Sequence, residues 1–553
     1  MHLSRRGFTG GALTAALAGQ LSLPAFAQGR ADLTGALSAI RSYGELHRSY
    51  YGLPGMTLGL TTADGFATVL NFGFANADAR TPITGDTLFQ VGSISKLMVA
   101  ALLHQFAAEG RFSLTDGIDK LLPGLALPAG NAIQVQHLLD HVAGLPGDAP
   151  TFPDGGLWTA YAPGAHWHYS NTAYAMLGKL AEHVGGKPLG RLLEDRLFNP
   201  LGMARSRGAI LAPDRLLYAQ GYEAADQITP FVRGAPLAPA AWVDVVEGAG
   251  CVASTADDMN RFLRSLANAA QGRGGLGLSA ASAKAYTGHA VPSDTQGMTY
   301  GNGLMHVANA GRSYLHHTGG MVSFSSSFHI DLASGVGTFA SSTITAFADY
   351  RPRLLSRFAV DALTSALAGK PLPSPPRVDT PLANSAAYVG RYSGPGGSFE
   401  IRPGKPLTLV ADGRYADLEY VGGNLFRTLH PLFRRFSLMV EKKAGVITGA
   451  AWGPNAYVHG GSGGGVPASD PELARLAGRY ANDDPWWTGI GTIVERGGKL
   501  WLGTETPLTK IGDNLWRVGD ESWSPERASF ANVIDGRPQT LIFSGQKFVR
   551  RDI

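Results

Sequence analysis

A serine and a lysine stand three residues apart, at Ser93 and Lys96, in the run Gln90-Val-Gly-Ser-Ile-Ser-Lys. Residues 97–108 are apolar and contain no glycine or proline, so they predict a buried helix that begins near Ser93. Residues i and i+3 share one helix face, so the amine can reach the hydroxyl. A lysine in an apolar site can be neutral and accept the serine proton, and a helix amino terminus offers N–H groups to an oxyanion. Taken alone, the motif also fits a capped helix start with a solvated lysine.

A second polar motif, Tyr169-Ser-Asn171, lies between a predicted loop and a predicted helix over residues 173–184. A phenol beside an ammonium group is expected to have a lowered pKa, so Tyr169 could accept the proton of Ser93 and pass it to a leaving group. We expect the Asn171 amide to donate to a substrate carbonyl. The alternative is a tyrosine packed at a capped helix start.

A third motif, His317-Thr-Gly-Gly320, opens onto a strand pattern. Two glycines let a substrate backbone approach a strand edge closely. We expect the N–H of Gly320 to be the second oxyanion donor, beside that of Ser93. A glycine bulge in an edge strand is the alternative.

The composition suits a folded protein of several domains. With 553 residues, 44% hydrophobic and 16% charged, the chain predicts two to four domains with large cores. A formal charge of +4, lower still without Arg5 and Arg6, does not indicate binding to nucleic acid or to an acidic membrane surface. The single cysteine, Cys251, excludes an internal disulfide and is expected to be a buried, inert thiol.

Residues 1–27 have the features of an export signal. Ser4-Arg-Arg-Gly-Phe8 is a twin-arginine pattern, an apolar stretch follows, and Ala25-Phe-Ala27 is a small-x-small cleavage site. No later run reaches the roughly 20 apolar residues that span a bilayer. We therefore expect a periplasmic or secreted protein that is not stably inserted in a membrane.

The region from residue 28 to residue 370 predicts an α+β domain. Helices are expected over residues 31–51, 133–140, 173–184, 259–267 and 353–367, and strands over residues 55–62, 66–72, 314–332 and 335–342. Because strands occur at both ends with helices between them, we predict an antiparallel sheet flanked by helices.

The character of the chain changes after a Pro-rich linker at residues 371–380. Tyr388-Val-Gly-Arg-Tyr392 recurs as Leu476-Ala-Gly-Arg-Tyr480, and alternating strands with polar turns follow each copy. We predict two small antiparallel β-barrels, at residues 381–459 and 470–553, separated by a Gly-rich linker at 460–469. Unrelated sandwich domains are the alternative.

The three motifs, in this order, resemble those of the serine penicillin-recognising hydrolases, the β-lactamase and penicillin-binding-protein superfamily. The similarity is to the class C-like branch, which includes D,D-carboxypeptidases, D-aminopeptidases, esterases and class C β-lactamases. It covers about residues 31–367, includes Leu138-Leu-Asp-His-Val-Ala-Gly-Leu-Pro146 and Pro200-Leu-Gly-Met203, and implies the β-lactamase/transpeptidase-like fold.

The resemblance implies a role for each motif residue. Ser93 would be the acylated nucleophile, with Lys96 and Tyr169 as the pair that handles protons. Asn171, His317 and Thr318 would bind the substrate, the last two at a carboxylate. Many β-lactamases carry lysine at the position of His317, and an imidazole holds a carboxylate less firmly, so the peptidase branch is favoured.

The two predicted barrels resemble those of D-aminopeptidases, in which one barrel sends a loop over the active site. Asn482-Asp-Asp-Pro-Trp-Trp487 is a candidate for that loop, with two carboxylates to hold an amine. An ordinary barrel turn is the alternative, and whether Asp483 and Asp484 reach the active site is left open.

We therefore expect a serine hydrolase that acts through an acyl-enzyme on amide bonds of peptides, including D- or non-standard residues. A carboxylesterase or a β-lactamase is the alternative within the superfamily, and a catalytically silent sensor of peptidoglycan or β-lactams is the alternative outside enzymes. No metal or cofactor is expected, because His137 and His141 lie one helical turn apart without a third ligand in view. The expected partner is a small peptide or ester substrate, and the oligomeric state is left open.

Overall fold

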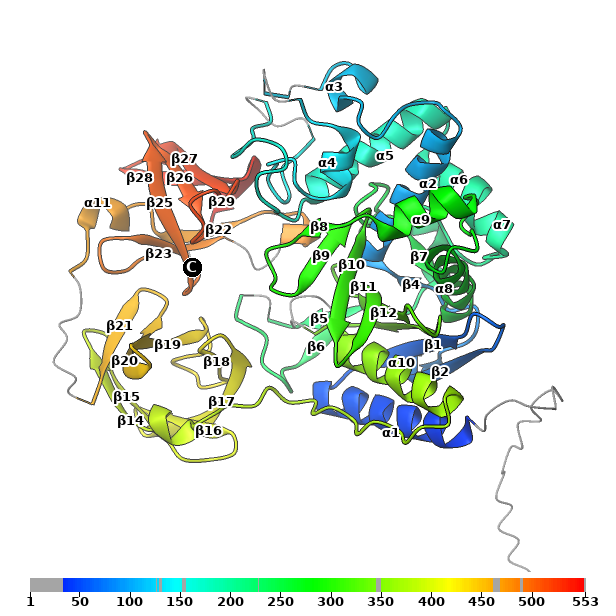
Figure 1. Cartoon of the computed structure of the whole chain (residues 1–553). Helices are drawn as coiled ribbons and strands as arrows, with labels where there is room; N and C mark the ends of the chain where they lie inside the picture. Colours follow the sequence, from blue (N-terminus) through cyan, green and yellow to red (C-terminus); the bar gives the residue numbers. More distant parts are fainter. Residues whose placement is uncertain are drawn as a thin grey trace, which may run out of the picture.

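The computed structural model describes residues 33–125, 127–128, 132–151, 156–226, 228–344, 350–460, 468–487 and 491–551. An α+β domain is followed by two closed barrels, so the predicted fold class is confirmed (Figure 1). The predicted export signal lies outside the described residues. Within them, no helix has the length and apolar character needed to cross a membrane.

A nine-stranded antiparallel sheet forms the centre of the first domain, in the order β3-β2-β1-β13-β12-β11-β10-β9-β8. Its strands are β1 (Gly55–Thr61), β2 (Ala67–Asn76), β3 (Thr81–Pro82), β8 (Val291–Pro292), β9 (Met298–Gly301), β10 (Leu304–Asn309), β11 (Arg312–Gly320), β12 (Ser325–Asp331) and β13 (Gly337–Ser342). Leu58 of β1 pairs with Leu70 of β2 and with Ala340 of β13. The early and late strands of the domain therefore share one sheet, as predicted.

The strand expected over residues 314–332 is two strands. β11 ends at Gly320 and β12 begins at Ser325, and the two residues pair with each other across the hairpin. The N–H of Met321 donates to the carbonyl of Phe324 at 2.8 Å, which closes the turn. The turn residues are themselves mostly apolar, so the hydrophobic pattern of the sequence continues from β11 into β12. The turn between the two strands therefore could not be recognised from that pattern.

Helices cover both faces of the sheet (Figure 1). They are α1 (Thr34–Tyr51), α2 (Ser95–Ala108), α3 (Ile118–Leu121), α4 (Val135–Leu139), α5 (Asn171–Gly185), α6 (Leu189–Leu193), α7 (Asn199–Leu201), α8 (Ala256–Ala270), α9 (Ala280–Gly288) and α10 (Arg353–Leu367). On one face, Ile40 of α1 and Phe358 of α10 share a core with Leu58 of the sheet. On the other face, α2, α5, α8 and α9 form the larger core. Two short pairs, β4 (Phe89–Gln90) with β7 (Ala253–Ser254) and β5 (Tyr222–Ala224) with β6 (Leu237–Pro239), lie outside the main sheet.

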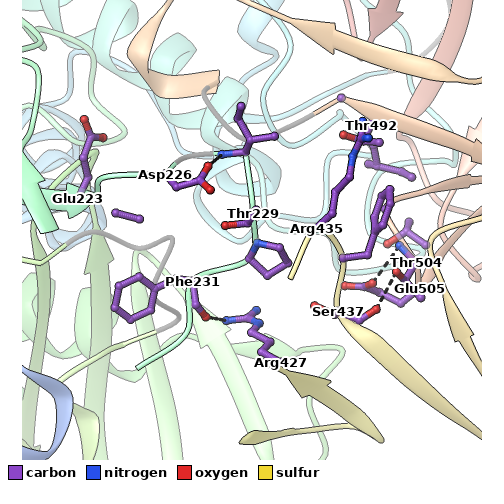
Figure 2. Close-up of a pocket in the computed structure, with 18 residues that line it drawn as sticks. Glu223, Asp226, Thr229, Phe231, Arg427, Arg435, Ser437, Thr492, Thr504 and Glu505 are labelled. Carbon is purple, nitrogen blue, oxygen red and sulfur yellow. Dashed lines mark hydrogen bonds between the residues drawn. The ribbon is translucent and has the colours of Figure 1, made fainter. Parts of the chain in front are cut away.

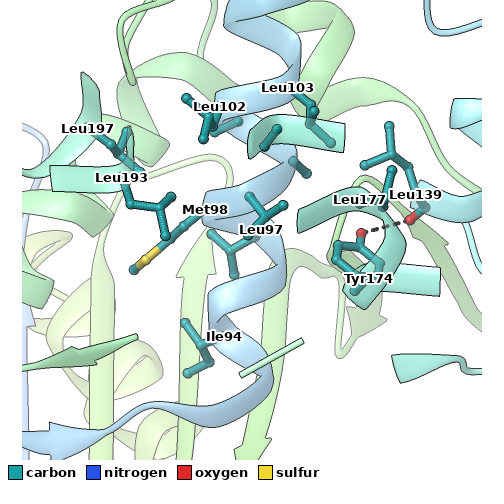
Figure 3. Packing of buried hydrophobic residues seen from close by; sticks show 14 of the residues in the cluster. Ile94, Leu97, Met98, Leu102, Leu103, Leu139, Tyr174, Leu177, Leu193 and Leu197 are labelled. Carbon is teal, nitrogen blue, oxygen red and sulfur yellow. Dashed lines mark hydrogen bonds between the residues drawn. The ribbon is translucent and has the colours of Figure 1, made fainter. Parts of the chain in front are cut away.

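Helix α2 is the centre of the larger core. Every residue from Ser95 to Phe106 is buried, and Figure 3 shows Leu97 and Leu102 among side chains such as Leu177 and Leu193 from neighbouring segments. A helix that is apolar on all sides belongs inside a domain, so the predicted buried helix is confirmed. It follows a single 3-10 turn, η1 (Gly92–Ile94), which carries Ser93.

The two barrels begin with the same short motif. The first contains β14 (Gly390–Gly394), β15 (Gly397–Arg402), β16 (Leu407–Ala411), β17 (Arg414–Gly422), β18 (Leu425–Arg427), β19 (Leu438–Lys443), β20 (Val446–Trp452) and β21 (Asn455–His459). The second follows the short helix α11 (Pro471–Ala474) and contains β22 (Gly478–Ala481), β23 (Thr492–Glu495), β24 (Leu500–Leu502), β25 (Thr506–Gly512), β26 (Leu515–Val518), β27 (Arg527–Ile534), β28 (Arg537–Phe543) and β29 (Gln546–Arg550). The Tyr392 hydroxyl donates to the carbonyl of Tyr388 at 2.9 Å, and the Tyr480 hydroxyl donates to that of Leu476 at 2.8 Å. The repeated tyrosine thus makes the same hydrogen bond at the first strand of each barrel.

Polar contacts hold the barrels to each other. Arg496 of the second barrel donates to the carbonyl of Gly453 in the first at 2.6 Å, and the N–H of Gly453 donates to the hydroxyl of Thr504 in the second at 3.2 Å. A cavity of about 350 Å³ lies where all three domains meet and carries charges of both signs, among them Arg427 and Glu505 (Figure 2). Ser93 does not line this cavity.

Candidate active site

The turn that carries Ser93 packs directly against the end of β11. A Cβ on Gly92, whose φ is +58°, would lie 2.8 Å from the nitrogen of Gly320, and a Cβ on Gly319 would lie 1.9 Å from the carbonyl oxygen of Val91. Both glycines are therefore required for this approach. The structure places the backbone of Gly320 beside the Ser93 turn, where the sequence predicts an oxyanion donor.

Lys96 is fully buried and has three oxygen partners. Its Nζ lies 3.1 Å from Ser93 Oγ, 2.6 Å from Asn171 Oδ1 and 2.8 Å from the carbonyl oxygen of Ala249. Burial lowers the pKa of Lys96 to about 7, so a large fraction of this amine is neutral at neutral pH. A neutral amine has two hydrogens, which the Asn171 and Ala249 oxygens accept, and one lone pair, which is left to accept the Ser93 proton.

Tyr169 adjoins both groups, but its pKa moves in the direction opposite to the prediction. The Lys96 Nζ lies 4.9 Å from the centre of the Tyr169 ring. Burial raises the pKa of Tyr169, and a hydrogen bond with the Ser93 hydroxyl opposes this only in part. The expectation of a lowered pKa was wrong because the same burial that raises it also removes charge from Lys96. The phenol therefore stays protonated and can act as a donor.

Asn171 is the first residue of α5 and connects Lys96 to an acidic side chain. Ser170 caps this helix by accepting from the N–H of Ala173. Because Asn171 Oδ1 accepts from Lys96, its Nδ2 points the other way and donates to Asp148 Oδ1 at 2.6 Å. One amide hydrogen of Asn171 is thus engaged by Asp148, so the predicted contact with a substrate carbonyl would use the other.

A chain of three buried side chains, His141, Tyr300 and His317, lies beneath the site. The N–H of Ser170 donates to His141 Nδ1 at 3.1 Å, so His141 carries its proton on Nε2 and donates to the Tyr300 hydroxyl at 3.1 Å. Tyr300 then donates to His317 Nε2 at 3.2 Å, and His317 Nδ1 donates to the carbonyl of Thr318 at 2.6 Å. Each proton position follows from the one before it.

The hydrogen bonds among these three side chains leave His317 unsuited to bind an anion. Burial, and secondly the charge of Lys96, lower the pKa of His317 to about 3, so the imidazole is neutral. Both of its nitrogens are already hydrogen-bonded within the protein. His317 and Thr318 line the cavity as predicted, but among the described residues that line it the cation is Arg351.

Ser93 lies where two cavities of opposite charge meet. The smaller, of about 340 Å³, is lined by Tyr169, His317, Thr318 and Arg351, and we call it the basic lobe. The larger, of about 510 Å³, is lined by Asp148, Asp244, Glu247 and Asp484, and we call it the acidic lobe. Ser93, Asn171, Gly320, Met321 and Trp486 line both.

The second barrel contributes directly to this cleft. Asp484 and Trp486, from the segment between β22 and β23, line the acidic lobe. Asp483 instead forms an ion pair with Arg551 at 2.7 Å and is 91% exposed. Of the two predicted carboxylates, Asp484 therefore reaches the cleft and Asp483 does not.

His137, His141 and Cys251, to which the sequence assigns no part in catalysis, have structural contacts. His137 accepts a hydrogen bond from the N–H of Gln134 at the start of α4, and His141 belongs to the chain with Tyr300. Cys251 is a buried free thiol, as predicted. Among the described residues, no group of three or more His, Cys, Asp or Glu side chains is placed to hold a metal ion.

A model of the β-lactamase family matches residues 36–360, which is more than half of the chain. The chain belongs to the β-lactamase family. It is 34% identical over 172 residues to a β-lactamase of Pseudomonas fluorescens, which covers 29% of this chain and 48% of that protein. It is 27% identical over 221 residues to penicillin-binding protein 4* of Bacillus subtilis (strain 168), covering 35% and 48%. The aligned regions thus span about half the length of these relatives.

Solved structures share the β-lactamase-family fold. The penicillin-binding protein homologue from Pyrococcus abyssi matches with a TM-score of 0.55 at 20% identity and covers 76% of this chain and 98% of its own. A D-amino acid amidase from Ochrobactrum anthropi SV3 matches with a TM-score of 0.51 at 24% identity, covering 61% and 99%. The relatives of this β-lactamase-family chain are hydrolases of the serine β-lactamase and penicillin-binding-protein superfamily, which supports a serine hydrolase.

Several residues of this β-lactamase-family site were not predicted from the sequence. Asp148 lies in a loop rich in Gly, Pro and Asp, where one carboxylate does not stand out. Tyr300 and Arg351 belong to no motif, and only the folded chain brings them beside His317. Near these residues, the sequence feature that indicated a functional site was the predicted helix start at Asn171.

The close approach at Gly319 predicts a loss of activity in Gly319→Ala. The added methyl group must displace either β11 or the Val91 carbonyl, which moves Gly320 away from the Ser93 turn. We propose that Gly320 is an oxyanion donor, and because loss of one such donor costs about 10²-fold or more, we expect kcat to fall by roughly that factor. Steady-state kinetics measures this. Gly35→Ala in α1, where an added Cβ meets nothing within 4 Å, is the matched control and should keep the wild-type rate.

Proposed function

We propose that this β-lactamase-family chain hydrolyses amide bonds of short peptides that carry a free amino group, through an acyl-enzyme on Ser93. The observation that carries the proposal is the contact of Ser93 with a buried Lys96 whose pKa is about 7, at the junction of two oppositely charged lobes. A neutral amine with a free lone pair is the base that a serine nucleophile needs.

The proposed reaction proceeds in two halves. Lys96 takes the proton of Ser93, and the serine oxygen bonds to the substrate carbonyl carbon. The negative charge on the carbonyl oxygen faces the N–H groups of Ser93 and Gly320. The C–N bond then breaks, the Tyr169 phenol gives its proton to the leaving amine, and Lys96 returns a proton to Tyr169. In the second half, Lys96 takes a proton from water, and the water oxygen bonds to the carbonyl carbon of the ester. The C–O bond to Ser93 then breaks, Lys96 returns the proton to Ser93 Oγ, and the acid product leaves.

The position of Tyr169 supports an orientation for the substrate. Tyr169 lines only the basic lobe, and the group that protonates the leaving amine must lie beside it. The leaving group therefore occupies the basic lobe, where Arg351 and Thr318 suit a carboxylate. The acyl group occupies the acidic lobe, where Asp148 and Asp484 suit an ammonium group. Such a cleft fits the removal of an amino-terminal residue from a short peptide.

Matched substrates test this proposal. We expect D- and L-alanine p-nitroanilides with a free amine to be hydrolysed at least about tenfold faster, in kcat/KM, than their N-acetylated forms. p-Nitrophenyl acetate and nitrocefin are measured in parallel. Equal rates for the free and acetylated amides would contradict the acidic-lobe assignment. Preference for nitrocefin would support a β-lactamase, preference for the ester would support a carboxylesterase, and a stable adduct without turnover would support a sensor.

We also propose that the protein acts outside the cytoplasm. Support comes from the twin-arginine pattern at Arg5-Arg6 and from the small-residue site that ends at Ala27. Amino-terminal sequencing of the protein recovered from the periplasm should begin at Gln28. A protein recovered only from the cytoplasm with an intact amino terminus would contradict this.

A further inference from the structure

A carboxylate of the second barrel, Glu526, lies against the first domain beside the cleft. Its Oε1 accepts from the N–H of Gly147 at 2.6 Å and contacts His168 Nε2 at 2.9 Å, and its other oxygen accepts from the hydroxyl of Ser544. The side chain is 18% exposed. Both carboxylate oxygens are therefore occupied, and one of them joins the barrel to a loop more than 350 residues away in the sequence.

The two partners of Glu526 in the first domain flank the active-site segment. The carbonyl of Gly147 accepts from the N–H groups of Asn171 at 2.7 Å and Thr172 at 3.1 Å. His168 immediately precedes Tyr169. Glu526 thus contacts His168 directly, at the start of the segment that contains Tyr169 and Asn171, and it reaches Asn171 through the backbone of Gly147. Because Asn171 Oδ1 accepts from Lys96, the contacts run from Glu526 through Gly147 and Asn171 to the proposed base.

The barrel has other contacts with the same loop. Trp158 Nε1 donates to the carbonyl of Pro525 at 2.8 Å. The rings of His166 and Trp523 stack with centroids 4.8 Å apart, and the Arg527 guanidinium lies 5.0 Å from the centre of the Trp158 ring. These contacts do not involve the Glu526 side chain, so its removal leaves the barrel attached.

The hydrogen bonds of Glu526 are those of a charged group. Burial alone would raise its pKa, but the hydrogen bonds from His168, Ser544 and the Gly147 N–H outweigh that effect and lower it. The carboxylate is therefore ionised at neutral pH. Hydrogen bonds to an ionised acceptor are roughly twice as strong as those to a neutral one, which suits a group that fixes a loop.

We propose that Glu526 is a positioning residue for the hydrolase site, which it serves by fixing the Gly147 loop so that Asn171 holds Lys96 against Ser93. This inference rests on the proposed function. It gives the second barrel a part in the chemical step, in addition to the cleft wall formed by Asp484 and Trp486.

The variant Glu526→Ala tests the proposal. A displacement of about 1 Å at a catalytic group can cost about 10²-fold, so we expect kcat to fall tenfold to a hundredfold and KM to change less. The rate at which a fluorophosphonate modifies Ser93 should fall by a similar factor, because that reaction needs the base but no natural substrate. Glu526→Gln, which keeps an oxygen acceptor for Gly147 but no charge, should fall between Ala and wild type.

A matched control separates positioning from stability. Glu495 of the second barrel is also buried and accepts from the N–H groups of Asp470 at 3.1 Å and Gly498 at 2.8 Å, away from the cleft. Glu495→Ala should lower the Tm and leave the modification rate of the folded protein unchanged. If Glu526→Ala does not fold, Glu526→Gln is compared with Glu495→Gln in the same way.

The outcomes distinguish this inference from the proposed function. A wild-type protein that is active, together with a Glu526→Ala variant that reacts at the same rate, overturns the inference and leaves the function intact. An equal loss of rate in the Glu495 and Glu526 variants also overturns it. A folded wild-type protein that is neither modified at Ser93 nor active on any substrate overturns both.

Discussion

Replacement of Ser93 by alanine is expected to lower turnover of every substrate by about 10⁴-fold or more while the fold is retained. The Ser93 hydroxyl lies at the junction of the two lobes and contacts the Lys96 amine. Among the described residues there, it is the only potential nucleophile with that contact. Loss of a serine nucleophile removes the covalent half of catalysis and leaves only binding and oxyanion stabilisation. Steady-state kinetics on the best substrate gives the loss, and circular dichroism checks the fold.

A second serine variant is the control for this experiment. Ser49→Ala removes an exposed hydroxyl from α1, so it should match the wild type in both kcat and Tm. Residual turnover in Ser93→Ala within about tenfold of the wild type would mean that another residue is the nucleophile. A large fall in Tm would mean that the hydroxyl has a structural role instead.

Replacement of Lys96 by methionine is expected to lower kcat/KM by about 10³-fold and to change its pH dependence. General-base catalysis contributes typically 10²–10⁴-fold. In the wild type, the amine below pH 7 is protonated and has no lone pair for the Ser93 proton, so kcat/KM should rise as the pH increases through about 7. In Lys96→Met this rise should be absent. Profiles from pH 5 to pH 9 measure the difference, and a wild-type profile that falls across pH 7 would contradict the assignment.

The same lysine predicts a pH dependence of stability. The pKa of Lys96 is about 7 in the fold, whereas an ordinary lysine has a pKa of 10.5, so between these values the unfolded chain binds more protons than the native one. The free energy of unfolding of the wild type should therefore gain a contribution that rises with pH across this window. Lys96→Met lacks that contribution. Urea unfolding of both proteins at pH 7 and pH 9 gives the difference, and an identical change in both would contradict the lowered pKa.

The groups that were predictable from the sequence are those whose chemistry depends on local spacing. Ser93 and Lys96 meet because a helix begins between them, and Asn171 lies at a capped helix start. The two barrels were predictable because each begins with the same Gly-Arg-Tyr, whose tyrosine makes the same hydrogen bond in both copies.

The features that escaped prediction depend on contacts between distant segments. Tyr300, Arg351 and Glu526 acquire their neighbours only when the sheet and the second barrel come together. The direction of the Tyr169 pKa shift depends on how deeply the phenol is buried, and a sequence does not give that depth. The break after Gly320 escaped because the turn that follows is itself mostly apolar.

The most direct test of the account is to identify the residue that a serine-directed reagent modifies. The full-length protein is incubated with a fluorophosphonate, and the adduct is located by mass spectrometry of the intact chain and of its peptides. We predict one adduct, on Ser93, that is absent from Ser93→Ala and forms far more slowly in Lys96→Met. A folded wild-type protein that gains no adduct, or gains it on another residue, would contradict the assignment of Ser93 as the nucleophile.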